Sequence, residues 1–194
     1  MRALIVDDER LARKELMKLL EDHPSIEVVG EAMNADEAIQ LVNDLNPDLL
    51  FLDIQMPGKT GFQLLEELDS VPLVIFTTAY DEFALKAFEV NALDYLLKPI
   101  QPERLAEAVS KLADKERAMN LATRGPEKKH GLQDQVFVKD GDRCWFVSLN
   151  NVRLFESDGN YIKVYFDNNR PMIHKSLNAL DEKLDERAFF RASR

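Results

Sequence analysis

The sequence predicts an α/β fold with a doubly wound, five-stranded parallel sheet, followed by a smaller part that is mainly β. Over about the first 119 residues, five short apolar runs alternate with five segments of helical periodicity. This alternation is typical of parallel sheets that carry helices on both faces. After about residue 133 the pattern changes to short strand-like segments separated by turn-forming residues, which predicts mainly β structure.

Apolar runs and helix signals place each element of the first part. Leu49–Leu52 lacks alternation, as expected of a strand that is buried on both faces. Asn34 and Glu37 have the spacing of a capping box and predict where the second helix begins. The first helix is expected to bury four leucines along one side: Leu11, Leu16, Leu19 and Leu20. The expected strands are 3–6, 26–29, 49–52, 73–76 and 93–97, and the later helices are 35–45, 62–68, 81–90 and 102–119.

Residues 120–133 form the predicted linker between a first domain, 1–119, and a second domain, 134–194. The linker is polar, contains Gly and Pro, and breaks the periodicity. The expected elements of the second domain are the hairpins 136–139/144–148 and 152–155/161–166 and a helix over 177–184. Four phenylalanines of this domain are expected in its core: Phe155, Phe166, Phe189 and Phe190.

Composition limits the classes of protein to consider. Hydrophobic residues make up 45% of the chain and charged residues 31%, which is ordinary for a soluble globular protein. No apolar stretch approaches the ~20 residues that span a bilayer, and no signal-peptide pattern precedes the first strand, so we expect no membrane partner. Cys144 is the single cysteine, which excludes an intrachain disulfide and favours a cytoplasmic location.

The charge is unevenly distributed along the chain. The net charge is −10, but the first 120 residues carry −12 and the remaining 74 carry +2. This asymmetry predicts that any polyanionic partner, such as duplex DNA, binds the second domain.

Polar side chains suited to phosphoryl chemistry follow the ends of four predicted strands. Asp7 and Asp8 follow the first strand, Asp53 the third, Thr78 the fourth and Lys98 the fifth. The carboxyl ends of parallel strands form the usual ligand site of such sheets. Three carboxylates gathered there favour a divalent cation with oxygen ligands, and Mg²⁺ suits them. An aspartate can also act as the nucleophile that forms an aspartyl-phosphate, with nearby cations and a hydroxyl stabilising the phosphoryl oxygens.

Four motifs resemble the signature of receiver domains of two-component response regulators: LIVDDE (4–9), LDIQMPG (52–58), TA (78–79) and DYLLKP (94–99). The resemblance covers residues 1 to about 118 and implies a flavodoxin-like fold. It also implies that Asp53 is the phosphoacceptor and that a sensor histidine kinase supplies the phosphoryl group. In such domains Asp8, Asp53 and the backbone carbonyl of Gln55 would ligate Mg²⁺, and Asp7 would act through a water molecule.

The same resemblance implies how the site responds to phosphorylation. Lys98 would contact one phosphoryl oxygen and the Thr78 hydroxyl another. Tyr95 would be the aromatic residue that swings inward on activation. A cis peptide bond is expected between Lys98 and Pro99, although sequence alone makes cis the minority state of such bonds.

Three other interpretations of these residues fit the sequence less well. One aspartate at a strand end is usually a turn former or a helix cap, but here four strands bring polar residues to one edge. Gly58-Lys59-Thr60 resembles the end of a P-loop, yet the first glycine of that motif would fall on Asp53, and Pro57 offers no N–H to a phosphate. Haloacid-dehalogenase-type phosphatases place an acid/base aspartate two residues after the nucleophile, where this chain has Gln55.

Segments of the second domain resemble LytTR-type DNA-binding domains: LFES (154–157), YIKV (161–164), HKSL (174–177) and FFRASR (189–194). The resemblance covers about 132–194 and implies a mainly β domain that reads DNA through loops. The family pattern continues beyond residue 194, so we expect the domain to be incomplete in this chain. Four residues are candidates for contacts with phosphates or base edges: Asn160, Lys163, Arg191 and Arg194.

The sequence therefore predicts a response regulator that accepts a phosphoryl group on Asp53 and thereby controls DNA binding and transcription. It would be a phosphoacceptor that assists its own Mg²⁺-dependent phosphoryl transfer, rather than a turnover enzyme. We expect phosphorylation to promote a homodimer that pairs two DNA-binding modules. The alternatives are a receiver coupled to a protein-interaction output without DNA binding, and a phosphatase.

Overall fold

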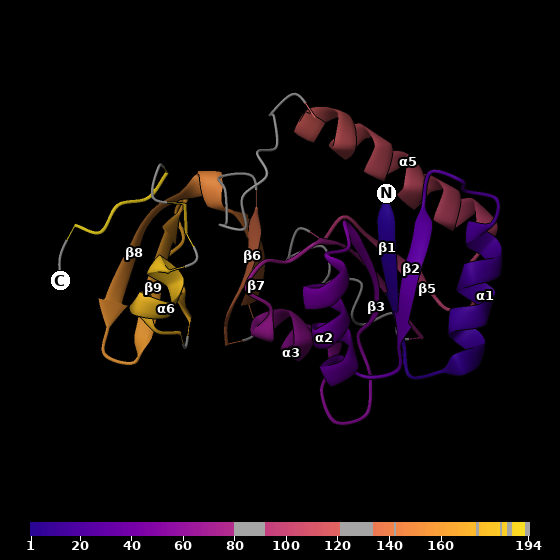
Figure 1. The fold of residues 1–194 in the computed structure, drawn as a ribbon, viewed down its shortest axis with the longest axis horizontal. Helices are drawn as coiled ribbons and strands as arrows, with labels where there is room; N and C mark the ends of the chain where they lie inside the picture. The colour runs from indigo at the N-terminus through magenta and orange to yellow at the C-terminus, as the bar shows by residue number, and fades with distance from the viewer. Residues whose placement is uncertain are drawn as a thin grey trace.

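The computed structural model describes residues 1–79, 92–120, 134–141, 143–173, 175–182, 184–185 and 188–192. The predicted helix 81–90 lies outside the described residues, as does nearly all of the predicted linker. A five-stranded parallel sheet in the order β2-β1-β3-β4-β5 forms the first part (Figure 1). Its strands are β1 (Arg2–Val6), β2 (Glu27–Ala32), β3 (Leu49–Asp53), β4 (Leu73–Thr78) and β5 (Asp94–Leu97). The helices described with it are α1 (Arg10–Leu20), α2 (Ala35–Leu45), α3 (Gly61–Glu67) and α5 (Pro102–Asn120).

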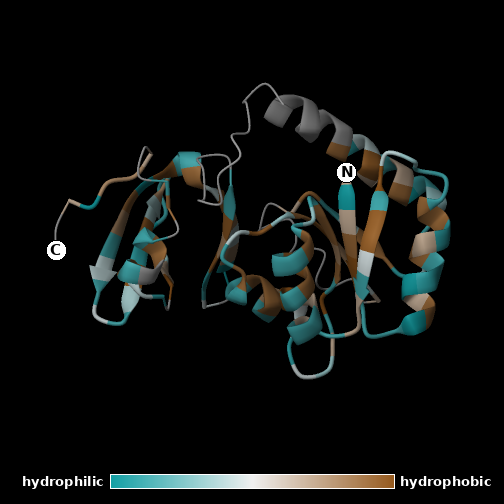
Figure 2. Cartoon of the chain, viewed as in Figure 1, coloured by the Kyte–Doolittle hydropathy of each residue, from teal (hydrophilic) through white to brown (hydrophobic). Residues whose placement is uncertain are grey.

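The sheet is covered on both faces, as the predicted doubly wound fold requires. Helices α2 and α3 pack on one face and α1 and α5 on the other. Side chains alternate between the faces along each strand, so that Leu4 lies in the first apolar layer and Ile5 in the second. Figure 2 shows the apolar residues concentrated on these strands. The fold prediction for the first part is confirmed.

A capping hydrogen bond sets the start of α2. The Asn34 side chain accepts a hydrogen bond from the Glu37 N–H and so begins α2 as predicted.

The prediction that Leu11 of α1 is buried is wrong. Leu16 and Leu20 of α1 are buried, but Leu11 is 78% exposed. Leu11 lies five positions before Leu16, which turns its side chain about 140° around the helix and away from the sheet.

The second part is built from two small antiparallel sheets. A hairpin of β6 (Gln135–Asp140) and β7 (Arg143–Ser148) is followed by the 3₁₀ turn η1 (Leu149–Asn151). The other sheet has the order β10-β9-β8. Its strands are β8 (Val152–Asp158), β9 (Tyr161–Phe166) and β10 (Met172–Ile173), and the helix α6 (Leu177–Asp181) comes after them.

Two predictions about the second part need correction. Helix α6 ends at Asp181 rather than at Leu184, although Leu184 is still buried in the core. Leu177, Leu180 and Leu184 all pack in the same core, so the apolar pattern continues past the end of the helix and could not locate that end. Phe190 is 87% exposed, because its neighbour Phe189 takes the place against Phe155 in the core.

No helix among the described residues combines the length and the apolar character needed to cross a bilayer.

Candidate functional site at the carboxyl end of the sheet

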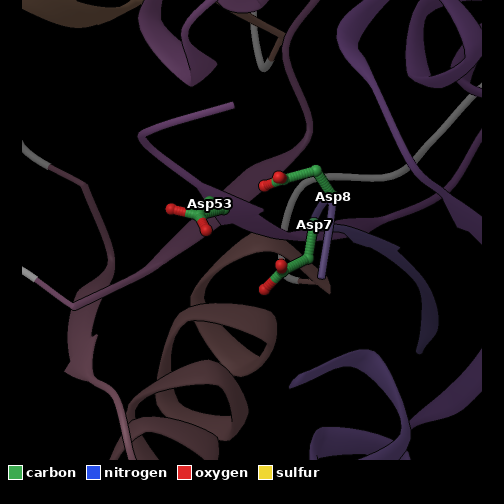
Figure 3. A group of neighbouring side chains, drawn as sticks. All are labelled: Asp7, Asp8 and Asp53. Atoms are coloured by element: carbon green, nitrogen blue, oxygen red, sulfur yellow. The ribbon is translucent and has the colours of Figure 1, made fainter. Parts of the chain in front are cut away.

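Three carboxylates meet where β1 and β3 end. Asp7 and Asp8 follow β1 directly and Asp53 is the last residue of β3, the strand that pairs with β1. Each offers an oxygen that lies within 4.8 Å of the others. Figure 3 shows the three side chains gathered at this edge. Asp7 and Asp53 are only 3% and 5% exposed, whereas Asp8 is open to solvent. The structure thus brings together the three carboxylates that the sequence places at these strand ends.

Lys98 joins two of these carboxylates. It follows β5, and its Nζ lies 2.5 Å from Asp53 Oδ2 and 2.6 Å from Asp7 Oδ2. The Lys98 N–H donates to the Thr78 carbonyl, which holds the end of β5 beside the end of β4. The Lys98–Pro99 peptide bond is cis, as expected.

Backbone donors orient the two buried carboxylates. The Glu9 N–H donates to Asp7 Oδ1 over 2.9 Å, and the Gln55 N–H donates to Asp53 Oδ1 over 3.0 Å. Asp53 therefore holds one oxygen against the backbone and the other against Lys98. Hydrogen bonds to the charged form of a carboxylate fix its direction as well as favouring ionisation.

The pKa shifts follow from burial and from these pairs. Burial raises the pKa of Asp53 above its ordinary value, and the hydrogen bond and charge of Lys98 offset only part of this effect. Burial alone would lower the pKa of Lys98, but its hydrogen bonds to Asp53 and Asp7 raise it. Lys98 therefore stays cationic at neutral pH, and a second cation would favour the ionised form of Asp53.

The three carboxylates line a pocket that residues of α1 also line. Gln55, Thr77, Ala79 and Lys98 also line it. The two predicted switch residues do not line this pocket. Thr78 is completely buried at the end of β4 and is not among the lining residues, and Tyr95 is half-buried and packs against the apolar layer shared with α3.

Sequence reasoning missed the role of Arg13. Its Nη1 donates to the backbone oxygen of Asp7 over 2.7 Å, and its Nε pairs with Glu31 at 3.0 Å. Arg13 is 9% exposed and thus anchors the turn that carries the carboxylates. The sequence signal for this role was the position of Arg13 on the same side of α1 as Leu16 and Leu20, the side that faces the sheet.

Gly61 is a second residue whose role the sequence did not reveal. It begins α3, and a Cβ at this position would lie 2.4 Å from the backbone oxygen of Asp53. Only glycine lets α3 approach the end of β3 this closely.

We therefore expect Gly61→Ala to destabilise the chain by about 1–3 kcal/mol, because the added methyl group must push α3 away from β3. Thermal unfolding measures this. Glu67→Ala, on the exposed side of the same helix, is the matched control and should cost less than about 1 kcal/mol. Equal unfolding temperatures for the two variants would contradict the steric argument.

Comparison with known families agrees with this geometry. The profile of the response regulator receiver domain matches residues 3–110, and that of the LytTr DNA-binding domain matches residues 142–194. The chain belongs to the response regulators that carry a LytTR DNA-binding domain. It is a two-component response regulator with a DNA-binding output. Both resemblances expected from the sequence are confirmed.

Curated relatives of this response regulator resemble it over nearly its whole length. An uncharacterized response regulatory protein of Vibrio cholerae is 42% identical over 183 residues, which cover 93% of this chain and 76% of the relative. The sensory transduction protein LytT of Enterococcus faecalis is 36% identical, with 100% and 81% covered. The positive alginate biosynthesis regulatory protein of Pseudomonas aeruginosa is 37% identical, with 96% and 78% covered.

Solved structures resemble the receiver part. The response regulatory domain of mrkE from Klebsiella pneumoniae has a TM-score of 0.55 and 34% identity, and covers 61% of this chain and 99% of its own. The receiver domain of AraT from Geobacillus stearothermophilus has a TM-score of 0.55 and 36% identity, with 61% and 97% covered.

The four candidate DNA contacts of the response regulator differ in their surroundings. Asn160 is exposed in the turn between β8 and β9. Lys163 Nζ pairs with Asp158 at 2.5 Å, and Arg191 Nη1 donates to Asn178 over 2.8 Å. Arg194 lies outside the described residues. A DNA phosphate would therefore have to compete with partners in the chain for Lys163 and Arg191.

Proposed function

We propose that Asp53 accepts a phosphoryl group from a phosphohistidine of a sensor kinase. A carboxylate oxygen of Asp53 forms the new bond to phosphorus, the bond from phosphorus to the imidazole nitrogen breaks, and the imidazole leaves. The observation that carries this proposal is that Asp53 lies close to the carboxylates of Asp7 and Asp8 and pairs with the ammonium group of Lys98. Phosphoryl transfer needs mainly positioning and charge stabilisation, which this arrangement provides.

Mg²⁺ fits the oxygen donors of this site. Asp8, Asp53 and the backbone carbonyl of Gln55 would hold the ion, and Asp7 would hold it through water. When bound, Mg²⁺ neutralises charge on the phosphoryl oxygens. Lys98 compensates part of the negative charge of Asp7 and Asp53, so their repulsion does not force the site apart. With Gln55 in place of an acid/base aspartate, the chain would store the phosphoryl group rather than turn over a substrate.

Phosphorylation would affect the second domain through changes at three side chains of the receiver. Lys98 and Thr78 would bind phosphoryl oxygens, and Tyr95 would fill the space that Thr78 leaves. Coupling requires only that the phosphoryl group interacts differently with two states of the chain. We place the resulting homodimer contact on β5 and α5, where Leu97 is exposed.

Phosphoryl-dependent dimerisation gives a direct prediction for Lys98→Ala. With Mg²⁺ and beryllofluoride as a phosphoryl mimic, the wild-type chain should double its mass in sedimentation. Lys98→Ala should bind the metal yet stay monomeric, because the group that senses the phosphoryl oxygen is gone. Lys59→Ala, a surface lysine that pairs with Asp36 and Glu67 and lies on neither β5 nor α5, is the control and should dimerise. A Lys98→Ala dimer would exclude this role.

Control of DNA binding and transcription in the cytoplasm is the output that we propose. Two paired modules would bind repeated half-sites with increased avidity. The second candidate, an output that binds protein rather than DNA, keeps the same receiver chemistry. A third candidate, a phosphatase, would release phosphate continuously from a phosphomonoester without accumulating phosphorylated protein.

Salt dependence separates the DNA output from the protein-binding output. We expect the affinity for duplex DNA to fall about tenfold or more between 50 mM and 200 mM salt, because contacts to phosphates release counterions. Fluorescence anisotropy with a labelled duplex measures this. Arg191→Ala should reduce the slope of affinity against salt, whereas Arg2→Ala in the receiver should leave it unchanged. Affinity without salt dependence would contradict phosphate recognition.

A further inference from the structure

Arg13 of α1 contacts the backbone on both sides of Asp8, the exposed carboxylate of the site. Its Nη1 donates to the Asp7 carbonyl over 2.7 Å and lies 3.5 Å from the Asp8 carbonyl. These two carbonyls belong to the peptide groups that precede and follow the Asp8 Cα. Because the two peptide planes set the backbone dihedrals of Asp8, Arg13 fixes the direction in which the Asp8 side chain leaves the main chain.

The Asp8 carboxylate depends on its backbone more than the other two carboxylates do. Asp7 and Asp53 each accept a backbone N–H on one oxygen and pair with Lys98 through the other. Among the residues that the structure describes, none donates a hydrogen bond to the Asp8 carboxylate, which is directed toward Asp53 (Figure 3). Its place in the group of three therefore follows from the backbone that Arg13 holds.

Glu31 sets the orientation of the Arg13 guanidinium. Arg13 Nε donates to Glu31 Oε2 over 3.0 Å, and Glu31 belongs to β2, the strand that pairs with β1. The Arg13 side chain is 11% exposed and that of Glu31 is 38% exposed. A guanidinium is a rigid planar fork, so the bond at Nε determines where Nη1 points. A lysine ammonium has a single nitrogen and could not bind both partners at these two positions.

Ligand direction matters for the cation that suits this site. Mg²⁺ requires nearly ideal octahedral geometry, so a carboxylate that points a little away from its position loses much of its contribution. Residues that do not touch the ion but orient its ligands typically change metal affinity 10–100-fold. The positive charge of Arg13 by itself opposes a second cation nearby, so any gain in affinity from Arg13 must come from geometry.

We propose that Arg13 is a positioning residue of the Mg²⁺ site, that it acts through the backbone of Asp8, and that Glu31 orients it. The inference rests on the proposed binding of Mg²⁺ by Asp8 and Asp53, and it adds the pair of residues that sets the affinity. The pair links the end of β2, which contributes no ligand, to the carboxylates at the ends of β1 and β3.

Calorimetric titration of the full chain with Mg²⁺ tests this role. Arg13→Gln should weaken binding about tenfold or more, whereas an effect of charge alone would strengthen it. Arg13→Lys keeps the charge but not the fork, and it should also weaken binding. Lys14→Gln removes an exposed positive charge from the next position of α1 and should change the affinity less than about twofold.

The outcomes of this titration separate the two proposals. A wild-type chain that does not bind Mg²⁺ contradicts the proposed function. Wild-type binding with unchanged or stronger binding by Arg13→Gln overturns the positioning role alone. An Arg13→Lys variant with wild-type affinity would also overturn it, because the ammonium cannot reproduce the fork.

Glu31→Gln tests the orienting pair in a variant that leaves the buried arginine in place. Because the pair is partly exposed, we expect Mg²⁺ binding to weaken up to about fivefold. Without Mg²⁺, exchange of the Glu9 amide should speed up by the same factor, because this amide donates to Asp7 in the turn that Arg13 holds. Amides of α2 should keep their protection.

A double-variant cycle distinguishes orientation from a direct effect of the Glu31 charge. If Glu31 acts through Arg13, Glu31→Gln should have no further effect on Mg²⁺ affinity in the Arg13→Gln chain. A full additional effect there would refute the orienting role. Should Arg13→Gln fail to fold, Glu31→Gln alone decides: weaker Mg²⁺ binding with unchanged Glu9 exchange, or unchanged Mg²⁺ binding, would contradict the proposal.

Discussion

The Asp53→Asn variant should take up no phosphoryl label from a small phosphodonor with Mg²⁺, whereas the wild-type chain should take up one group. An amide lacks the anionic oxygen that attacks phosphorus. Asparagine is nearly isosteric with aspartate and still offers an oxygen to the Gln55 N–H, which donates to Asp53 in the wild type. Loss of label would therefore report on chemistry rather than unfolding. Mass spectrometry of the intact chain measures the group, which should be acid-stable and base-labile.

Asp36→Asn is the matched control for this experiment. Asp36 is an exposed carboxylate that pairs with Lys59 on the surface, and its loss should leave labelling unchanged. Labelling of Asp53→Asn at the wild-type level would show that Asp53 is not the phosphoacceptor. Labelling that is lost in both variants would point to a general effect of removing negative charge.

The Asp8→Ala variant should lose Mg²⁺ binding and labelling together. Asp8 is the exposed carboxylate of the three, and the two that remain, Asp7 and Asp53, already pair with Lys98. We expect the affinity for Mg²⁺ to fall at least about tenfold, because affinity for such hard cations depends on the number of charged oxygen ligands. Calorimetric titration with Mg²⁺ measures the affinity, and labelling at a fixed Mg²⁺ concentration measures the consequence.

Glu9→Ala provides the control for the loss of a neighbouring charge. Glu9 also lines the pocket but does not belong to the group of three carboxylates. Its removal should leave the affinity for Mg²⁺ within about twofold of the wild-type value. If Glu9→Ala weakens binding as much as Asp8→Ala, the effect of Asp8 is one of general charge rather than coordination.

Much of the receiver could be predicted from local pattern. Leu49–Leu52 reads as a strand buried on both faces and is one. Because parallel strands end at one edge, the positions of Asp7, Asp53 and Lys98 after their strands sufficed to predict a common site. The boundaries 1–119, 120–133 and 134–194, and the roles of the individual site residues, stay predictions.

Side-chain direction was harder to predict. Leu11 has the same residue type as Leu16 and Leu20, but its angular position on α1 turns it to solvent. Phe190 follows Phe189 directly, and one position against Phe155 admits only one of them. Hydrophobicity sets how much a side chain gains from burial, but the shape of the surrounding core decides which side chain is buried.

The sequence by itself therefore determined the doubly wound sheet, the mainly β second part and the set of residues at the strand ends, because these follow from periodicity and strand order. Only the tertiary structure decided that Lys98 bridges Asp7 and Asp53, that Gly61 lies against the Asp53 backbone, and that Phe137 and Phe146 complete the receiver core. Such contacts join residues that are far apart in the chain. Their occurrence depends on distances that no local pattern encodes.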